Sequence, residues 1–439
     1  MISGWINSGW RHVDSSHQED IAIVRDVAEC MALLIQDANP PDVRQFILSD
    51  PRAEALRAQF RAVRASCVRC IERKDLCQIE EVCGVALPPP RPVDARAVLG
   101  RSWEEYAGLE YWKPGWTPPV PSLDGLDAQL ALSLHGRFAD SERLLNKIRA
   151  ADPGDDRAAF NAGWFAMRDG DLQRAGELLD RGRRERVFGN PFPPSSAPVI
   201  GSDTDIRGKT VLFHGEGGFG DQIFNIHFVD GLKERGAKVV VSCSGELHSI
   251  FARMKNVDAV VSEHAASVGV YHDYRLPGMS APWLSGRRLL PEGYLRADPA
   301  YVDKWKIHAN KIGVCYHGNN KFEHEQHRVF PRELMDRAVG SATVSLQYGE
   351  NDGIINWEDT AGIIANLRLV VTSCTAVAHL AAAMGRHTWI VLPILPYYTW
   401  AQPGVLSKWY SSVRLFRQTT YGDWEAPFNA IRRKLHELI

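Results

Sequence analysis

From residue 209 onward, short apolar runs alternate with helical stretches, and this alternation constrains the fold more than any other feature of the chain. Thr210–His214 and Ala237–Ser242 have the apolar, β-branched composition of strands. The stretch between them, Gln222–Arg235, has helical spacing, and Gly236 can cap its end. Strands joined through a helix run parallel, so we expect a parallel sheet with helices on its faces.

A second series of the same kind begins at Lys311. Two such series in tandem predict an α/β fold with two Rossmann-like lobes that face a cleft, one over 205–300 and one over 301–439. The expected elements of the second lobe are strands at Ile312–Tyr316, Ala342–Gln347, Leu369–Thr372 and Thr388–Leu392, and helices at Asp359–Asn366 and Thr375–Met384.

The chain before these lobes is predicted to be helical. Residues 1–118 indicate an all-α N-terminal domain, and 119–190 contain a repeat with a period of 34 residues. This is the tetratricopeptide period, in which a small residue lies where two helices cross and apolar residues face the next repeat. The pairs that share the spacing are Gly136 and Gly170, Ser141 and Ala175, and Leu145 and Leu179.

Charge and hydropathy exclude several classes of function. The chain has 51 Lys and Arg against 53 Asp and Glu, a net charge of −2, which gives no basic surface for nucleic acid. No apolar run approaches the length of a membrane span, and the first 20 residues lack the pattern of a signal peptide. The sequence therefore predicts a cytoplasmic protein whose cysteines are thiols or metal ligands.

Four of the eight cysteines fall within 17 residues, at Cys67, Cys70, Cys77 and Cys83. A C-x2-C pair is a common half of a zinc site, but a second such pair is missing. On a continuous helix, Cys67 and Cys77 would be about 15 Å apart, too far to share an ion. A structural zinc site and a set of buried thiols both remain open here.

The turn Gly215-Glu-Gly-Gly-Phe-Gly220 follows the first strand of the first lobe and satisfies G-x-G-x-x-G. A dinucleotide site would need an acid at the end of the next strand, where Glu246 comes late. The turn residues Gly217, Gly218 and Gly220 are candidates for phosphate contact. Asp221, next in sequence, is a candidate general base that accepts a proton from an acceptor hydroxyl; the alternative is that it only caps the helix.

A second candidate site is the strand-to-helix junction over 372–385. The helix starts without an acid in its first turn, so free N–H groups and the positive end of the helix dipole can bind a pyrophosphate. The hydroxyls of Ser373 and Thr375 are further donors to such an anion. His379, one turn later, is either a ligand contact or a core residue whose hydrogen bonds are satisfied within the protein. The candidate residues are Ser373, Cys374, Thr375, Ala376 and His379.

A third candidate is the segment His317–Arg328, where a Gly-Asn turn follows a strand. Asn319, Lys321 and Arg328 can present an amide and cations to phosphates. The alternative is a metal site on His324 and His327, whose H-x-x-H spacing lacks a third ligand at a helical offset.

Over about residues 122–435 the chain resembles the bacterial glycosyltransferases in which tetratricopeptide repeats are fused to a heptosyltransferase-like GT-B domain. The motifs that carry the resemblance are Gly-Phe-Gly-Asp-Gln-Ile (218–223), His-Asp-Tyr-Arg-Leu-Pro-Gly-Met-Ser (272–280), Tyr-Leu-Arg-Ala-Asp-Pro (294–299), His-Gly-Asn-Asn (317–320), Ser-Leu-Gln (345–347), Thr-Ala-Val-Ala-His-Leu-Ala (375–381) and Trp-Tyr-Ser-Ser-Val-Arg-Leu-Phe-Arg-Gln (409–418).

The resemblance implies a nucleotide-sugar donor on the C-terminal lobe, an acceptor on the N-terminal lobe, and inverting transfer without a metal or other cofactor. It implies Asp221 as the base and donor contacts from Asn319, Arg328, Gln347, Thr375, Ala376 and His379. Three positions have lost an acid of the family's pattern: Arg368, Cys374 and Tyr397. In the Gly-Asn loop, the family's usual Asp and first Arg are replaced by Glu325 and Gln326.

These observations lead to an expected function. The chain is predicted to be a glycosyltransferase of the hexosyl or heptosyl type whose helical region selects an acceptor, which we expect to be a protein. Because acids of the sugar pocket are replaced, the alternative is a degenerate protein that binds a nucleotide sugar or a partner without turnover.

Overall fold

The computed structural model describes residues 116, 125–185, 187–190, 197–262, 270–286, 293–318, 325–340, 342–351 and 353–437. The expected N-terminal domain over 1–118, with the cluster Cys67, Cys70, Cys77 and Cys83, lies outside the described residues except for Trp116. The elements below belong to the compact unit of residues 110–263 and 271–439. Within the described part, no helix combines the length and apolar character needed to cross a membrane.

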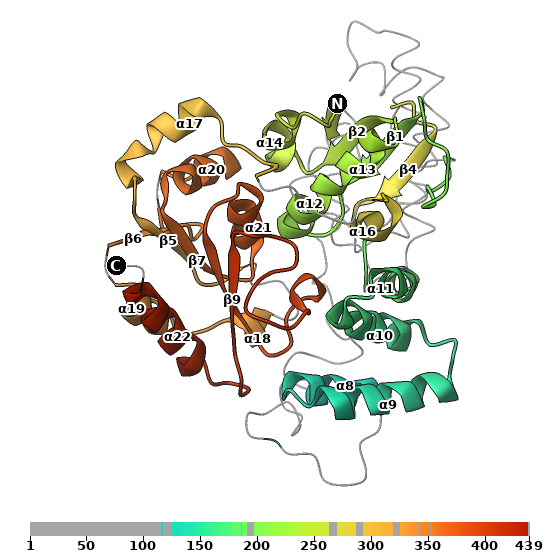
Figure 1. The fold of residues 1–439 in the computed structure, drawn as a ribbon, viewed down its shortest axis with the longest axis horizontal. Helices are drawn as coiled ribbons and strands as arrows, with labels where there is room; N and C mark the ends of the chain where they lie inside the picture. The colour runs from blue at the N-terminus through green and yellow to red at the C-terminus, as the bar shows by residue number, and fades with distance from the viewer. Residues whose placement is uncertain are drawn as a thin grey trace, which may run out of the picture. The chain divides into compact units, whose positions relative to one another are not determined.

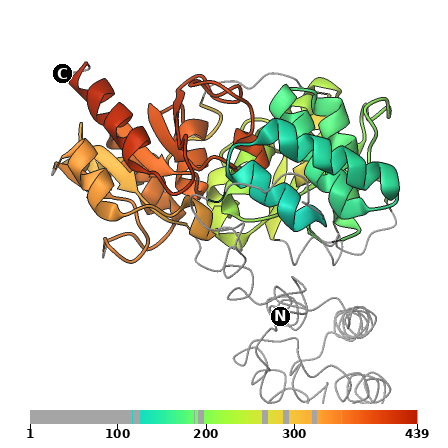
Figure 2. The same cartoon turned by 90° about the horizontal axis from the view of Figure 1, so that it is seen from below.

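Four helices open the described chain, and consecutive members pack against one another (Figures 1 and 2). The two glycines of the 34-residue spacing, Gly136 and Gly170, follow the first helix of each pair with φ angles of 75° and 84°. Ser141 and Ala175 are both fully buried. The period thus corresponds to two successive helix pairs, and their assignment as tetratricopeptide repeats stays a prediction. The elements are α8 (Gly125–Leu134), α9 (Phe138–Ala151), α10 (Asp156–Asp169), α11 (Leu172–Leu179) and the 3-10 helix η4 (Asp180–Arg183).

The first lobe is built on a parallel sheet with the strand order β3-β2-β1-β4. The chain moves outward from β1 to β3 and then returns to the other side of β1, so the carboxyl ends of β1 and β4 flank the point where the strand order reverses. In open parallel sheets, ligands bind at such a point. The strands are β1 (Thr210–His214), β2 (Lys238–Cys243), β3 (Ala259–Ser262) and β4 (Tyr274–Pro277).

The second lobe has a parallel sheet with the order β6-β5-β7-β8-β9. Here the order reverses between β5 and β7, which places the segments after these two strands at the same kind of position. The α/β prediction of two parallel-sheet lobes is confirmed. The strands are β5 (Ile312–Cys315), β6 (Thr343–Ser345), β7 (Leu369–Ser373), β8 (Thr388–Leu392) and β9 (Val413–Arg417).

Helices cover both sheets, and buried apolar side chains of β5, β7 and β8 face two separate hydrophobic clusters. In the first lobe the helices are α12 (Phe219–Asn225), η5 (Ile226–Phe228), α13 (Val229–Glu234), η6 (Gly245–Leu247), α14 (His248–Ala252), η7 (Gly278–Ser280) and α16 (Ala281–Leu284). In the second lobe they are α17 (Pro299–Lys304), η8 (Lys306–His308), α18 (Glu325–Arg328), α19 (Arg332–Val339), α20 (Trp357–Asn366), α21 (Ala376–Ala383), η9 (Tyr398–Trp400) and α22 (Glu425–His436).

The prediction of one continuous helix over Gln222–Arg235 is wrong in its first residue and in its continuity. It begins at Phe219, because Gly218 has an extended backbone and serves as the N-cap. The 3-10 segment η5 then separates α12 from α13. The end is confirmed, since Gly236 adopts a φ of 81° and the amide of Ala237 donates to the carbonyl of Leu232, 3.0 Å away.

The helical pairs are packed against both lobes. On the first lobe, Gly176 of α11 lies so close to Trp283 of α16 that a Cβ at this position would overlap the indole ring. On the second lobe, the indole Nε1 of Trp164 in α10 donates to the carbonyl of Pro396 over 2.9 Å. The absence of a side chain at Gly176 is therefore a condition for docking the helices.

Gly176→Ala should destabilise the folded chain by about 1–3 kcal/mol, because the new methyl group must displace a buried Trp side chain. Urea denaturation followed by circular dichroism measures this loss. Gly245→Ala is the matched control, since a Cβ there meets nothing within 4 Å. Equal stability of the two variants would contradict the packing described here.

Candidate functional site

The glycine-rich turn after β1 is held between neighbouring strand ends. The amide of Gly215 donates to the carbonyl of Ser242 at the end of β2, over 2.7 Å. Gln222 bonds both the amide and the hydroxyl of Ser244, at 3.0 and 2.9 Å. Gly217 has a φ of 71°, and a Cβ on it would lie 2.6 Å from Oδ2 of Asp221. Only glycine therefore fits where the turn approaches this carboxylate.

Asp221 lies in the first turn of α12 and is partly buried. Its Oδ2 accepts a hydrogen bond of 2.9 Å from the amide of Gly218, so it caps the helix as the alternative interpretation expected. Burial raises the pKa of Asp221 from 3.8 to about 6, against the opposing effects of the Gly218 amide, the Tyr397 side chain and the charge of Arg328. Capping and proton transfer are compatible, because a carboxylate has a second oxygen.

The junction between β7 and α21 contacts this turn directly. A Cβ on Gly220 would lie 3.4 Å from Cα of Ala376 and 3.2 Å from the ring of His379. Thr375 is the N-cap without a side-chain cap bond, and the first turn of α21 contains no acid. The start of α21 therefore keeps backbone donors and the positive end of its dipole at the same place as Asp221.

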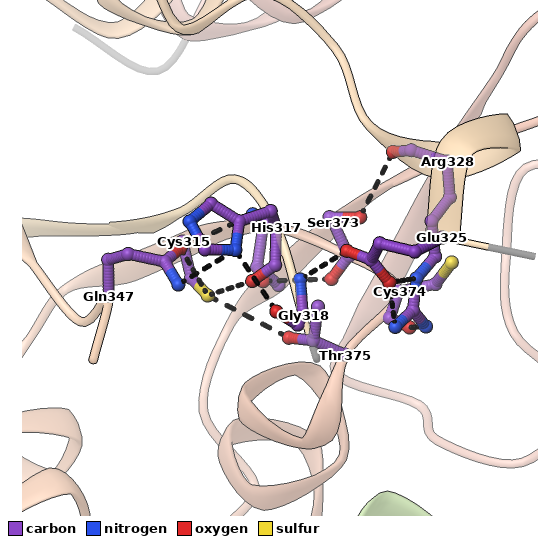
Figure 3. Close-up of polar contacts among 10 residues, drawn as sticks. Cys315, His317, Gly318, Glu325, Arg328, Gln347, Ser373, Cys374 and Thr375 are labelled. Carbon is purple, nitrogen blue, oxygen red and sulfur yellow. Dashed lines mark hydrogen bonds and ion pairs between the residues drawn. The ribbon is translucent and has the colours of Figure 1, made fainter. Parts of the chain in front are cut away.

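Arg328 is the central cation of the site (Figure 3). Its guanidinium forms an ion pair with Glu325, with Nε 2.5 Å from Oε2, and donates to the carbonyl of Cys374 over 2.8 Å. The other oxygen of Glu325 accepts from the amide of Gly318 over 2.6 Å. The pair thus ties the segment after β5 to the end of β7. Its positive charge acts on the pKa of four groups: Asp221, Cys315, Cys374 and His379.

The two hydroxyl residues predicted as ligand donors already have contacts within the protein. Ser373 is fully buried and donates to the backbone carbonyl of Arg328 over 3.4 Å. The Thr375 hydroxyl lies 3.8 Å from the Cys315 thiol. Burial raises the pKa of both Cys315 and Cys374, so both thiols are neutral at pH 7.

Gln347 organises the end of β5 from the side of β6. Its Oε1 accepts from the amides of Tyr316 and His317, at 3.3 and 3.2 Å, and its Nε2 lies 3.3 Å from His317 Nδ1 (Figure 3). This glutamine therefore fixes the start of the segment that leads to Arg328.

His379 is a core residue, as one of the two interpretations expected. Its ring stacks on Trp400 with centroids 4.7 Å apart, and Nδ1 lies 3.1 Å from the Tyr410 hydroxyl. Burial, with a further contribution from Arg328, lowers the pKa of His379 from 6.5 to about 3. A chain of hydrogen bonds runs from the neutral imidazole through the hydroxyl of Tyr410 to the hydroxyl of Tyr294. The Tyr294 hydroxyl donates to the carbonyl of Ile223 in α12 over 2.8 Å.

The structure brings together most of the predicted site: Gly217, Gly218, Gly220, Asp221, Arg328, Gln347, Ser373, Cys374, Thr375, Ala376 and His379. Asn319, Lys321 and His324 lie outside the described residues. His327 bonds Tyr421, and the described ranges contain no group of three residues suited to a metal. Glu325 was not predicted as the partner of Arg328, although its spacing of three residues on a helix was a usable signal.

Comparisons with known proteins add little to this picture. No protein-family model and no curated protein matches the chain. Among solved structures, a glycosyl transferase family 9 protein from Veillonella parvula is 8% identical with a TM-score of 0.40, over 53% of this chain and 97% of its own. E. coli ADP-heptose LPS heptosyltransferase II is 12% identical with a TM-score of 0.35, over 52% and 99%.

A mutant of the O-GlcNAc transferase from Thermobaculum terrenum is also similar. It is 11% identical with a TM-score of 0.28, over 98% of this chain and 89% of its own. At such low identities and TM-scores, these similarities carry no conclusion about the activity of this chain.

The raised pKa of Asp221 predicts a specific pH dependence of stability. Between pH 3.8 and about 6 the unfolded carboxyl has lost its proton while the folded one keeps it, so stability falls as pH rises through this window. Asp221→Asn removes this pH-dependent loss of stability, so the variant should be more stable than the parent by about 1–3 kcal/mol at neutral pH, with no gain at low pH. Urea denaturation at about pH 4 and pH 7.5 measures it. A gain that is equal at both pH values would contradict the assignment.

Proposed function

We propose that the chain is a glycosyltransferase that moves a sugar from a nucleotide-sugar donor to an acceptor hydroxyl, with inversion and with Asp221 as the general base. The observation that carries the proposal is the position of Asp221. This carboxylate, whose pKa is about 6, lies at the carboxyl end of β1, beside the acid-free start of α21 and within the field of Arg328.

The arrangement suits a single displacement. A diphosphate placed at the start of α21 would face backbone N–H donors and the positive end of the dipole. An acceptor hydroxyl on Asp221 would give its proton to the carboxylate while its oxygen forms a bond to the anomeric carbon. The bond from that carbon to the phosphate oxygen breaks on the opposite face, and the nucleoside diphosphate leaves with the electron pair.

The pKa of the base fits this role. A pKa of about 6 leaves Asp221 mostly ionised at pH 7, yet makes it a stronger base than an ordinary aspartate. The charge of the leaving group would be stabilised by the start of α21 and by Arg328, so we propose transfer without a metal. Turnover that is unchanged by a chelator would support this part of the proposal.

The helical pairs are proposed to present the acceptor, which we take to be a protein. The position of these helices supports this role. The helix α10 contacts the carbonyl of Pro396, and η4 contacts the glycine-rich turn that leads to Asp221. An acceptor bound along these helices would therefore lie near the proposed base.

One observation favours the alternative, a protein that binds a nucleotide sugar or partner without turnover. The guanidinium of Arg328 is already paired with Glu325 and with the carbonyl of Cys374. A phosphate must compete with this carboxylate for the cation, which weakens the stabilisation of a leaving group. Binding without transfer on any acceptor would select this alternative.

Asp221→Asn should lower kcat by about 100-fold or more, because a positioned base contributes about 10²–10⁴ to the rate. Donor affinity should change little, since the amide keeps an acceptor for the Gly218 N–H. Transfer from UDP-, GDP-, ADP- and CMP-sugars is measured, with Asp303→Asn on the exposed face of α17 as the control. Unchanged turnover in Asp221→Asn would remove this residue as the base.

Arg328→Gln should weaken nucleotide binding by about 10- to 100-fold, the range expected for a lost charge-assisted hydrogen bond. Isothermal titration with nucleoside diphosphates measures it. Arg332→Gln is the matched control, since this arginine pairs with Glu350 and is half exposed. Thermal stabilisation by NAD or FAD instead of these nucleotides would favour the dinucleotide interpretation of the glycine-rich turn.

A further inference from the structure

A buried ion pair joins the helical pairs to the glycine-rich turn. Both Nη atoms of Arg183, at the end of η4, donate to the two carboxylate oxygens of Glu216, over 2.6 and 2.9 Å. The Glu216 side chain is 0% exposed and that of Arg183 is 17% exposed. This glutamate occupies the second position of the turn, between Gly215 and Gly217, and was not among the residues that the sequence singled out.

The pair is part of a larger polar junction. Glu216 also accepts from the amides of Met279 and Asn190, at 2.9 and 3.1 Å. A Cβ on Gly189, whose φ is 74°, would collide with the Arg183 guanidinium. The Glu216 carboxylate thus accepts two hydrogen bonds from Arg183 and two from backbone amides, and these contacts hold it in one orientation.

A second carboxylate fixes the arginine itself. Asp180 accepts from Nε of Arg183 at 3.0 Å, from the Ser280 hydroxyl at 2.6 Å and from the Trp283 indole at 2.9 Å. Ser280 also accepts from Arg183, over 2.7 Å. The end of η4 is thereby attached to the segment after β4, which forms the other wall of the turn.

Such a junction is not explained by stability alone. Replacing a buried ion pair by apolar groups is often neutral or stabilising, so its value lies in the geometry that it imposes. Two residues beyond Glu216, the amide of Gly218 bonds Asp221. A shift of the turn at Glu216 therefore moves the donor that holds the carboxylate of Asp221.

We propose that Arg183 is a positioning residue: by fixing Glu216 it sets the conformation of the glycine-rich turn that holds Asp221, which makes the helical pairs a structural part of the active site. The catalytic role of Asp221 rests on the proposed function, whereas the coupling of Arg183 to Asp221 does not. The helices then have a role besides acceptor selection, and transfer to a small acceptor should require them too.

The side chains that surround Asp221 determine whether a change in its titration reports a movement of the turn. The charged and titratable side chains beside Asp221 or in contact with α12 include Glu216, Arg328, Tyr397 and Tyr398, together with His379 at Gly220, Tyr294 at Ile223 and His227 at Phe224. His379 is neutral over the pH range used, and the pKa of Tyr398 is raised well above 10 by burial. A shift in the titration of Asp221 on changing Arg183 would therefore report a movement of the turn.

Arg183→Lys is the test, because it keeps the positive charge beside Glu216 but loses the planar fork that binds both oxygens. Arg181→Lys is the matched control: Arg181 lies in the same 3-10 helix and pairs with Asp156 of α10 instead. We expect Arg183→Lys to lower kcat by about 10-fold or more while both KM values stay within about 3-fold, as for a loss confined to the transition state. Arg181→Lys should match the parent.

A second readout needs no substrate. The stability difference between each chain and its Asp221→Asn derivative is measured by urea denaturation from about pH 4 to pH 8. Its midpoint should move by about 0.5 pH units or more in Arg183→Lys and stay in place in Arg181→Lys. If the chain shows no turnover with any donor, the proposed function fails and this midpoint alone decides the inference. An unmoved midpoint together with an unchanged kcat would overturn it.

Discussion

The close approach of α12 and α21 is the constraint on which the described unit depends. Gly220 has no side chain, and a Cβ at this position would lie only 3.4 Å from the Cα of Ala376 and 3.2 Å from the ring of His379. The helix α12 follows β1 and α21 follows β7, the strands beside which the strand order of each sheet reverses. Ligands bind at such points in open parallel sheets, so this contact brings the two candidate edges together. A side chain at Gly220 would make tight contacts with Ala376 and His379, so these neighbours would have to move by a few tenths of an ångström.

Charge compensation distinguishes Asp221 from the other acids. Glu216 and Glu325 each have an arginine within hydrogen-bonding distance, and each pair fixes a segment rather than a ligand. Among the acids of the described residues whose pKa departs from its ordinary value, Asp221 alone is raised. Partial burial without a dedicated counter-ion is the physical condition for a basic carboxylate.

Local sequence patterns predicted the strands and the helix pairs better than they predicted the contacts between elements. The strands β1 and β8 have the predicted bounds, because apolar runs between turn residues mark them clearly, and the 34-residue spacing marked the buried Ser141 and Ala175. The start of α12 was placed late, since Gly-Phe-Gly has low helix propensity and the capping bond from Gly218 is visible only in three dimensions. The pairing of Arg183 with Glu216 joins residues that are 33 apart in the sequence, one at the end of η4 and one in the turn after β1, and no local period signals it.

The pairing of Arg328 with Glu325 gives the site a defined starting state. An arginine held by a carboxylate and by the carbonyl of Cys374 is oriented before a ligand arrives, which reduces the entropy lost on binding. The same pair lowers the net positive charge that a diphosphate bound as proposed would meet, so the start of α21 would supply much of the attraction, about half an elementary charge at short range. The position equivalent to Cys374 carries an acid in the family that the sequence resembles, and a neutral thiol there would spare a diphosphate bound as proposed a further repulsion. If a donor binds as proposed, the loss of that acid removes one hydrogen-bond acceptor for a sugar hydroxyl and also one negative charge near the diphosphate.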